Sequence, residues 1–439
     1  MSDTLLGRLD NLQKSGELNA KDAKREENLH RFFMYPGMMV PKTQTLIVDE
    51  ITHFTPHNPW VMDPFMGAGT SLLSCMEFGY NVFGQDINPF AVLLAKAKTA
   101  TYDIDTLSES FYTIMDMLQS DNTQDIDVNF NGINKWFNKR IQIDLSKIRR
   151  AIKQLACDEI RCFFWVVFSE VIRTGSNDRT STFKLHQRTN ENIKERNIDV
   201  INSFSELCER SLHDFAIFKM KLQSKGLVYN NKYTKKAITV WGNSMKKIET
   251  NQKFDLLVSS PPYGDNHTTI TYGQHSYLEL QWIPREDLPQ NIDFDFLRTT
   301  QEIDSQSLGG RVNSKYIQEI IELTIEKIPA LKKFFFEIPK EEYRKYYKTI
   351  AFINDFECCL DKIVKSMNHD AFYVWTIGNR RVAKREIPND IILVDLMKKN
   401  GINLYYTAER KILNKKQPRK NNFSKTMEKE RVLIFHNNK

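Results

Sequence analysis

Short apolar runs alternate with longer amphipathic segments over most of this chain. The runs with the length and composition of buried strands are residues 59–62, 81–85, 237–244, 255–259 and 371–378. Segments with helical spacing lie between or after them, at residues 43–51, 71–79, 91–100 and 391–400. Continuous apolar runs are typical of strands that are covered on both faces. The order of elements therefore predicts an α/β fold with helices on both faces of a largely parallel sheet.

Residues 101–233 have a different pattern, because helical spacing dominates there. One helix face is marked by apolar residues at alternating steps of four and three: Ile141, Leu145, Ile148, Ile152 and Leu155. We interpret this segment as a helical insert that divides the sheet domain. Residues 264–311 are polar and rich in turn-forming residues, and they are predicted to form a loop. Residues 402–413 and 432–436 are predicted to be the strands of a closing hairpin.

Two of the apolar runs end in sterically special turns. Residues 61–70 read VMDPFMGAGT, and residues 255–263 read DLLVSSPPY. Buried parallel strands deliver such turns to the carboxyl edge of a sheet, where open α/β folds bind ligands. Gly67 and Gly69 lack a Cβ atom, so the backbone can approach a ligand closely, and Thr70 begins a helix whose free N–H groups favour an anion.

A carboxylate ends the second predicted strand. Asp86 lies 23 residues after Asp63. Nucleotide-binding α/β units place a carboxylate at this spacing to accept hydrogen bonds from ribose hydroxyls. The glycine-rich turn and Asp86 together predict a ligand that contains a nucleoside.

The two turns together resemble those of the DNA methyltransferases that modify exocyclic amino groups with S-adenosylmethionine. The resemblance rests on Asp-Pro-Phe-x-Gly-x-Gly-Thr at residues 63–70 and on Ser-Pro-Pro-Tyr at residues 260–263, and it covers roughly residues 30–437. It implies a Rossmann-like methyltransferase sheet. The implied organisation is a peripheral segment (1–30), a cofactor-binding half (31–100), the insert as a DNA-recognition region (101–233) and a catalytic half (234–439).

The resemblance also implies which residues contact S-adenosylmethionine. They are Tyr35, Pro36, Asp63, Pro64, Phe65, Gly67, Gly69, Thr70, Asp86, Ile87 and Asn243. Tyr35 and Pro36 occupy the segment that packs over the methionine part, and Asp63 is expected to face the cleft. Residues after Asp86, beginning with Ile87, would flank the adenine. Asn243 stands where the family usually has an aspartate that binds the adenine amino group, and an amide can also hydrogen bond to adenine.

The Ser-Pro-Pro-Tyr turn carries the implied catalytic residues Ser260, Pro261, Pro262 and Tyr263. An exocyclic amine is a poor nucleophile, since its lone pair is delocalised into the base. Ser260 Oγ and the Pro261 carbonyl can each accept one amine N–H, while the prolines hold the backbone rigid. The base must leave the duplex, and Tyr263 offers it a stacking face. Serine at the first position favours cytosine N4 in this family, with adenine N6 as the alternative.

Basic side chains predict contact with double-stranded DNA. Residues 380–431 hold fifteen Lys and Arg but six Asp and Glu, so this segment exceeds the net charge of +7 of the whole chain. The polar loop 173–188 in the insert has side chains that suit phosphates and base edges. The candidate DNA contacts are Arg173, Arg179, Lys184, Lys415, Lys416, Arg419 and Lys420.

Composition narrows the remaining possibilities. None of the six cysteines follows a proline, which argues against methylation at cytosine C5, and their spacing indicates neither a metal site nor a disulfide framework. No apolar run approaches the length of a membrane span, so we expect a protein of the bacterial or archaeal cytoplasm. Its functional partner would be a restriction endonuclease. An RNA or protein methyltransferase and a catalytically silent DNA-binding protein are the competing interpretations.

Overall fold

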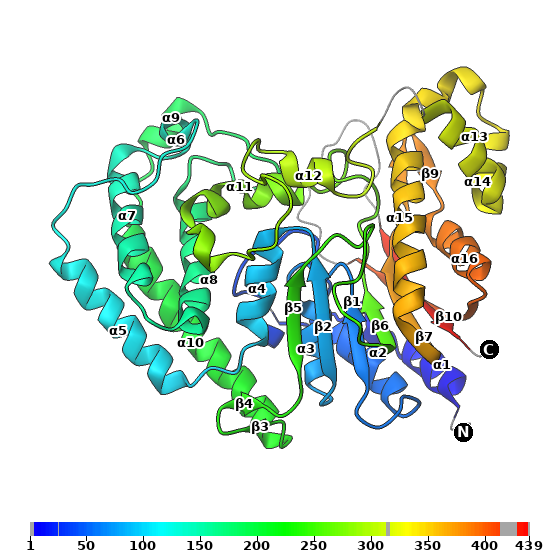
Figure 1. Cartoon of the computed structure of the whole chain (residues 1–439), viewed down its shortest axis with the longest axis horizontal. Coiled ribbons are helices and arrows are strands. Elements are labelled where there is room, and N and C mark those ends of the chain that lie inside the picture. The colour runs from blue at the N-terminus through cyan, green and yellow to red at the C-terminus, as the bar shows by residue number, and fades with distance from the viewer. Residues whose placement is uncertain (1–3, 25, 313–316, 413–427, 438–439) are drawn as a thin grey trace.

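The computed structural model describes the chain except for residues 1–3, 25, 313–316, 413–427 and 438–439. A seven-stranded sheet runs through its centre in the order β10-β11-β7-β6-β1-β2-β5 (Figure 1). The strands are β1 (Trp60–Asp63), β2 (Asn81–Asp86), β5 (Ala237–Trp241), β6 (Phe254–Ser259), β7 (Met367–Ile377), β10 (Asn403–Lys411) and β11 (Lys429–His436). β5, β2, β1, β6 and β7 are parallel, and β11 is antiparallel to both of its neighbours. The predicted α/β class and the closing hairpin are confirmed.

Each face of the sheet has its own apolar core, because successive strand residues point to opposite sides. On β1, Val61 belongs to the core that includes α1–α4 and the helical insert, whereas Met62 belongs to the core beneath α13–α16. The first group contains α1 (Leu5–Ser15), α2 (Pro41–Thr52), α3 (Thr70–Met76) and α4 (Pro89–Thr99). The second group contains α13 (Ile317–Lys327), α14 (Pro329–Phe336), α15 (Tyr347–Ser366) and α16 (Asn389–Lys399). A layer on each face fits the near-continuous apolar character of these strands.

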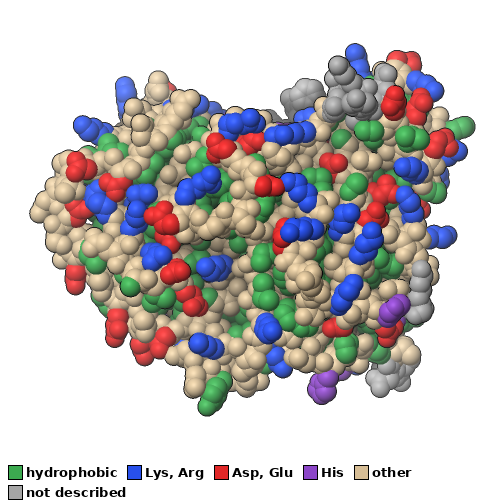
Figure 2. Space-filling view, in the orientation of Figure 1, with side chains coloured by type: hydrophobic (Ala, Val, Ile, Leu, Met, Phe, Trp, Pro, Cys, Tyr) green, Lys and Arg blue, Asp and Glu red, His purple; other side chains and the backbone are tan. Residues whose placement is uncertain are grey.

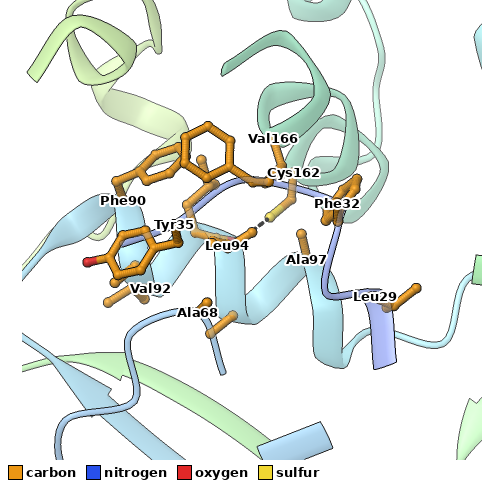
Figure 3. Packing of buried hydrophobic residues seen from close by; sticks show 14 of the residues in the cluster. Leu29, Phe32, Tyr35, Ala68, Phe90, Val92, Leu94, Ala97, Cys162 and Val166 are labelled. Atoms are coloured by element: carbon orange, nitrogen blue, oxygen red, sulfur yellow. Dashed lines mark hydrogen bonds between the residues drawn. The ribbon is translucent and has the colours of Figure 1, made fainter. Parts of the chain in front are cut away.

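The insert forms a helical lobe beside β5 and α4 (Figure 1). It holds α5 (Ile104–Ser120), α6 (Ile133–Trp136), α7 (Lys139–Lys153), α8 (Asp158–Gly175), α9 (Asn190–Lys194), α10 (Val200–Ser224) and the hairpin of β3 (Val228–Tyr229) and β4 (Lys232–Tyr233). Figure 3 shows how α8 joins the lobe to the sheet domain: Cys162 and Val166 lie over α4, close to Phe32 of the N-terminal segment. The lobe therefore shares a continuous core with the cofactor-binding half.

The prediction of a loop over residues 264–311 was wrong. The segment contains α11 (Tyr272–Trp282), α12 (Glu302–Gln306) and the 3₁₀ turn Arg285–Asp287. α11 is buried on several sides, where Leu278, Glu279 and Trp282 are almost inaccessible. A helix covered this way lacks the alternation of apolar and polar faces by which helices are recognised.

The N-terminal segment is more closely attached than its polar sequence suggested. Leu5, Leu9 and Leu12 of α1 are buried, and Gln13 exchanges two hydrogen bonds with the backbone of Glu409 on β10. Three further 3₁₀ turns (Glu17–Asn19, Glu27–Leu29, Lys340–Tyr346) and a small hairpin of β8 (Arg380–Val382) and β9 (Arg385–Ile387) complete the described elements. None of the described helices is both long and apolar enough to cross a membrane.

Candidate active site

A cleft opens at the carboxyl edge of the sheet, beside β1 and β6. These two parallel strands are neighbours. From β1 the chain continues to β2 on one side of the pair, and from β6 it continues to β7 on the other side, so the strand order reverses between them. Such a switch point is where open α/β sheets bind ligands. The sequence-predicted residues that line the cleft are Tyr35, Pro36, Pro64, Phe65, Gly67, Thr70, Asp86, Ile87, Asn243, Ser260 and Pro262.

Asp63 does not line this cleft, although it was expected to face it. Its side chain is fully buried, and it accepts hydrogen bonds from the Phe65 N–H (3.0 Å), the Ser259 hydroxyl (2.6 Å) and the Ser71 hydroxyl. Burial raises the pKa of Asp63 to about 6, against the opposing effect of these donors. Asp63 therefore links β1, β6 and α3 as part of the framework.

Asp86 does border the cleft. Its carboxylate accepts from the backbone N–H groups of Gly67 (2.9 Å) and Asn88 (2.8 Å), which ties the end of β2 to the glycine-rich turn. Burial raises the pKa of Asp86 to about 6. A carboxylate can accept about four hydrogen bonds, so Asp86 keeps acceptor capacity beyond its backbone partners at the border of the cleft. A carboxylate with this spare capacity can accept hydrogen bonds from ribose hydroxyls.

The two glycines of the first turn have different tasks. Gly67 lines the cleft at φ +47°, and a Cβ on it would lie 3.4 Å from the Tyr35 ring. Gly69 lies outside the cleft lining at φ +71°, and a Cβ there would come within 3.1 Å of the Ala95 Cβ on α4. Gly69 thus permits close packing of α3 on α4, and Gly67 shapes the ligand-facing wall. At the start of α3, the buried Thr70 hydroxyl has no hydrogen-bond partner within the described residues.

Aromatic rings form one wall of the cleft. Tyr35 stacks on Tyr272 of α11, with ring centroids 5.8 Å apart, and its hydroxyl accepts a hydrogen bond from the Asn88 amide at 3.0 Å. Figure 3 shows Tyr35 beside Phe90 at the start of α4. Tyr272 was missed by the sequence analysis because its helix was missed.

Asn243 lies in the cleft with its side-chain oxygen already engaged. The Oδ1 atom accepts from the Met245 N–H at 3.0 Å, which leaves the amide N–H₂ group as the end available to a ligand. This group donates, whereas the aspartate usual in the family accepts. An adenine held here would present a ring nitrogen to Asn243 more readily than its amino group.

The Ser-Pro-Pro-Tyr turn follows β6 directly. Ser260 and Pro262 line the cleft, and Pro261 is buried beside them. Tyr263 lies outside the cleft lining: its hydroxyl is 3.4 Å from Ser260 Oγ and donates to Glu430 at 3.0 Å. Burial and the Glu430 charge raise the pKa of Tyr263 well above its usual range, so the phenol keeps its proton.

Asn266 is a cleft residue that the sequence analysis did not single out. It is almost fully buried, and its side chain hydrogen bonds to Asp304, which also accepts from the Gly273 and Gln274 N–H groups at 2.9 Å each. Because the carboxylate accepts, the amide N–H₂ group of Asn266 points to it. The Oδ1 atom has no partner within the described residues. An unpaired, oriented acceptor in a cleft suits a ligand that donates N–H.

The residues predicted to contact DNA differ in their exposure to solvent and in whether they already form an ion pair. Arg179 and Lys184 are exposed on the loop between α8 and α9. Arg173, at the end of α8, is mostly buried and paired through two hydrogen bonds with Glu170 (2.6 and 2.9 Å). Lys415, Lys416, Arg419 and Lys420 lie outside the described residues. On the face drawn in Figure 2, Lys and Arg side chains are interspersed with Asp and Glu.

The chain is similar to known methyltransferases. A model of the D12 class N6 adenine-specific DNA methyltransferases matches residues 43–258. Type II methyltransferase M.MvaI of Kocuria varians is 31% identical over 445 residues, which cover 98% of this chain and 94% of that protein. Type II methyltransferase M.MjaII of Methanocaldococcus jannaschii is 36% identical over 97 residues, or 22% of this chain and 17% of that protein. An rRNA methyltransferase structure, aviRa from Streptomyces viridochromogenes, covers 96% of this chain and 93% of its own, with 9% identity and a TM-score of 0.33.

The cleft residues fit the methyl donor that this family uses. Asp86 has acceptor capacity for ribose hydroxyls, the unpaired Thr70 hydroxyl stands where α3 begins, and Tyr35 and Ile87 supply apolar surface. No group of His, Cys, Asp and Glu residues that could hold a metal ion occurs in the described parts of the chain. With a relative of 31% identity along 98% of its length, the chain belongs to the type II DNA methyltransferases, which take the methyl group from S-adenosylmethionine.

Proposed function

We propose that this protein methylates the exocyclic N4 atom of cytosine in duplex DNA, at a specific site that it thereby protects from a companion restriction endonuclease. The observation that carries the proposal is the position of Ser260. Its hydroxyl borders the cleft at the end of β6, in the same space as Asp86 and the glycine-rich turn. The first residue of this turn offers a hydroxyl as the acceptor, and in the family that the two turns resemble, serine at this position goes mostly with cytosine.

The turn can activate an amine without a covalent intermediate. Ser260 Oγ and the Pro261 carbonyl accept the two amine N–H groups, which localises the nitrogen lone pair toward the donor. Asn266 Oδ1 is a further unpaired acceptor on the same cleft wall. S-adenosylmethionine, when bound, supplies the electrophilic methyl group. The contribution of the protein is then positioning and a fixed set of dipoles.

The target base must be extruded from the duplex to reach this cleft, because its amino group is otherwise paired. The resemblance implies that Tyr263 supports the extruded base, although its side chain lies outside the cleft lining. We assign Arg179 and Lys184 the role of contacting the DNA near the helical lobe. Arg179 and Lys184 are both exposed, as residues that contact phosphates must be. The same role is proposed for Lys415, Lys416, Arg419 and Lys420.

Methylation of adenine N6 is the second candidate, and one observation favours it. The matching family model is described as N6 adenine-specific. Its match ends at residue 258, however, before Ser260. The matched residues include the cofactor turn and the insert but not the catalytic turn, so they bear on the cofactor more than on the base.

Nucleoside analysis tests the choice of base. Unmodified plasmid DNA is incubated with the enzyme and S-adenosylmethionine, digested to nucleosides and resolved by mass spectrometry. We expect N4-methylcytosine as the main product. N6-methyladenine as the main product would overturn the proposed base specificity, and transfer of label only to RNA or protein would overturn the proposed substrate class.

A further inference from the structure

A row of hydrogen bonds leads from the catalytic turn to the hairpin of β10 and β11. Ser260 Oγ lies 3.4 Å from the Tyr263 hydroxyl, which donates to Glu430 Oε1 at 3.0 Å. The other oxygen of Glu430 accepts from Arg410 Nε (2.7 Å) and Nη2 (2.6 Å). Arg410 and Glu430 are directly opposite each other on the two antiparallel strands. Their side chains are 9% and 14% exposed, so little water competes for these bonds.

One assignment of the two hydroxyl hydrogens satisfies this row of hydrogen bonds. A carboxylate that pairs with arginine only accepts, so the single hydrogen of the Tyr263 hydroxyl goes to Glu430. Toward Ser260 the phenol oxygen can then only accept. The single hydroxyl hydrogen of Ser260 is therefore directed to Tyr263, and the lone pairs of Ser260 Oγ are left for the cleft.

We propose that Glu430 and Arg410 are positioning residues that, through the Tyr263 hydroxyl, hold Ser260 as a hydrogen-bond acceptor toward the target amine. The proposal deepens the proposed function, since it rests on Ser260 accepting an amine N–H. A free serine hydroxyl rotates and can donate as well as accept. With its hydrogen committed, Ser260 resembles the accepting carboxylate that stands first in other turns of this kind.

Removal of the Tyr263 hydroxyl or of the Glu430 carboxylate should slow methyl transfer but leave S-adenosylmethionine binding unchanged. Tyr263→Phe keeps the ring but removes the hydroxyl, and Glu430→Gln keeps the shape but loses the ion pair with Arg410. Each is expected to lower the single-turnover rate on unmodified plasmid DNA about tenfold, which corresponds to the loss of one or two buried hydrogen bonds. The dissociation constant for S-adenosylmethionine, measured by calorimetry, should stay within about twofold and also reports that each variant is folded.

The same hairpin offers a matched control. Glu409 precedes Arg410 on β10 and pairs with Lys429 at 2.6 Å, and no bond connects it with Tyr263 among the described contacts. Glu409→Gln changes the same residue type in an ion pair between the same two strands, at a more exposed position. Its turnover rate should equal that of the unaltered enzyme.

A double-mutant cycle separates positioning from a general structural role. In a Ser260→Ala background, which is itself expected to be at least about 100-fold slower, Glu430→Gln and Tyr263→Phe should each add less than about twofold. A full additional tenfold loss in that background would show that the two residues act other than through Ser260 and would overturn the inference. An unchanged rate for Glu430→Gln alone would overturn it too. An unchanged rate for Ser260→Ala would instead overturn the proposed role of Ser260.

Discussion

Asp63 and Asp86 end neighbouring parallel strands, yet they have different tasks. Burial raises the pKa of each to about 6. Asp63 accepts three hydrogen bonds from the framework and does not line the cleft. Asp86 accepts two from backbone N–H groups and does line it. A carboxylate at a strand end is thus a ligand group only if some acceptor capacity is left over and faces the cavity.

The largest effect that distinguishes the two acids should be on stability. Asp63→Ala would leave the Ser71 and Ser259 hydroxyls and the Phe65 N–H without their acceptor, all in a buried place. We expect a loss of about 3 kcal/mol in the free energy of unfolding, measured with urea. Cofactor affinity of the folded variant should change less than about threefold. A large loss of affinity with normal stability would mean that Asp63 reaches the ligand after all.

Asp86→Ala should show the opposite balance. The loss of charge-assisted hydrogen bonds to the ribose hydroxyls should weaken S-adenosylmethionine binding by about 2 kcal/mol, or roughly 30-fold. Calorimetry at pH 8 measures this directly. The free energy of unfolding should fall by less than in Asp63→Ala, because Asp86 holds two backbone donors at a partly open site. Unchanged affinity would remove Asp86 from the ribose-binding role.

Acid should weaken cofactor binding through Asp86. Its pKa of about 6 means that the accepting carboxylate predominates above pH 6 and the neutral acid below it. Affinity is therefore expected to be level above about pH 7, to fall as the pH drops through 6, and to level off again once it is roughly 30-fold weaker, the loss expected for Asp86→Ala. In Asp86→Asn the charge cannot change, so the dependence should be flatter. A profile that is equally steep in both proteins would place the titrating group elsewhere.

The same contrast, between a side chain that is available to a ligand and one that is already paired, applies to two basic residues of the insert. It predicts the smallest effect. Lys184 is exposed, whereas Arg173 is paired with Glu170 and mostly buried. Lys184→Ala should weaken binding to all duplexes a few-fold and reduce the slope of log affinity against log salt by about 1. Arg173→Lys should leave that slope unchanged. Equal slopes in Lys184→Ala and the unaltered protein would direct the search for the DNA-binding face away from this loop.

Much of the architecture could be predicted from local pattern. The strands that end at Asp63, at Asp86 and just before Ser260 are apolar runs followed by turns, and such runs can be recognised without tertiary information. Most cofactor residues indicated by the resemblance do lie around one cleft. Their placement follows from parallel strands, whose carboxyl ends share an edge.

The remainder depends on contacts that no local pattern encodes. α11 is buried by parts of the chain distant in sequence, so its residues lack helical alternation, and Tyr272 and its partners were missed with it. The Tyr263–Glu430 hydrogen bond joins residues 167 positions apart. The inward position of Asp63 depends on Ser259, which is 196 residues away. Motif and strand position gave both acids the same status, and only the three-dimensional partners distinguish them.

The long sequence separation between β1 and β6 has a consequence for how the enzyme folds while it is synthesised on the ribosome. Ser259 of β6 must be synthesised before it can bond to Asp63 of β1, and roughly 200 residues lie between them. At about 5–20 residues per second this takes some 10–40 s. During this interval, β1 has an open edge on the side that β6 later covers. A nascent chain that ends within the insert has the glycine-rich turn and Asp86 but lacks Asn243, β6 and Ser260, so its cleft is incomplete. Premature termination there should yield aggregation-prone fragments that do not bind the cofactor.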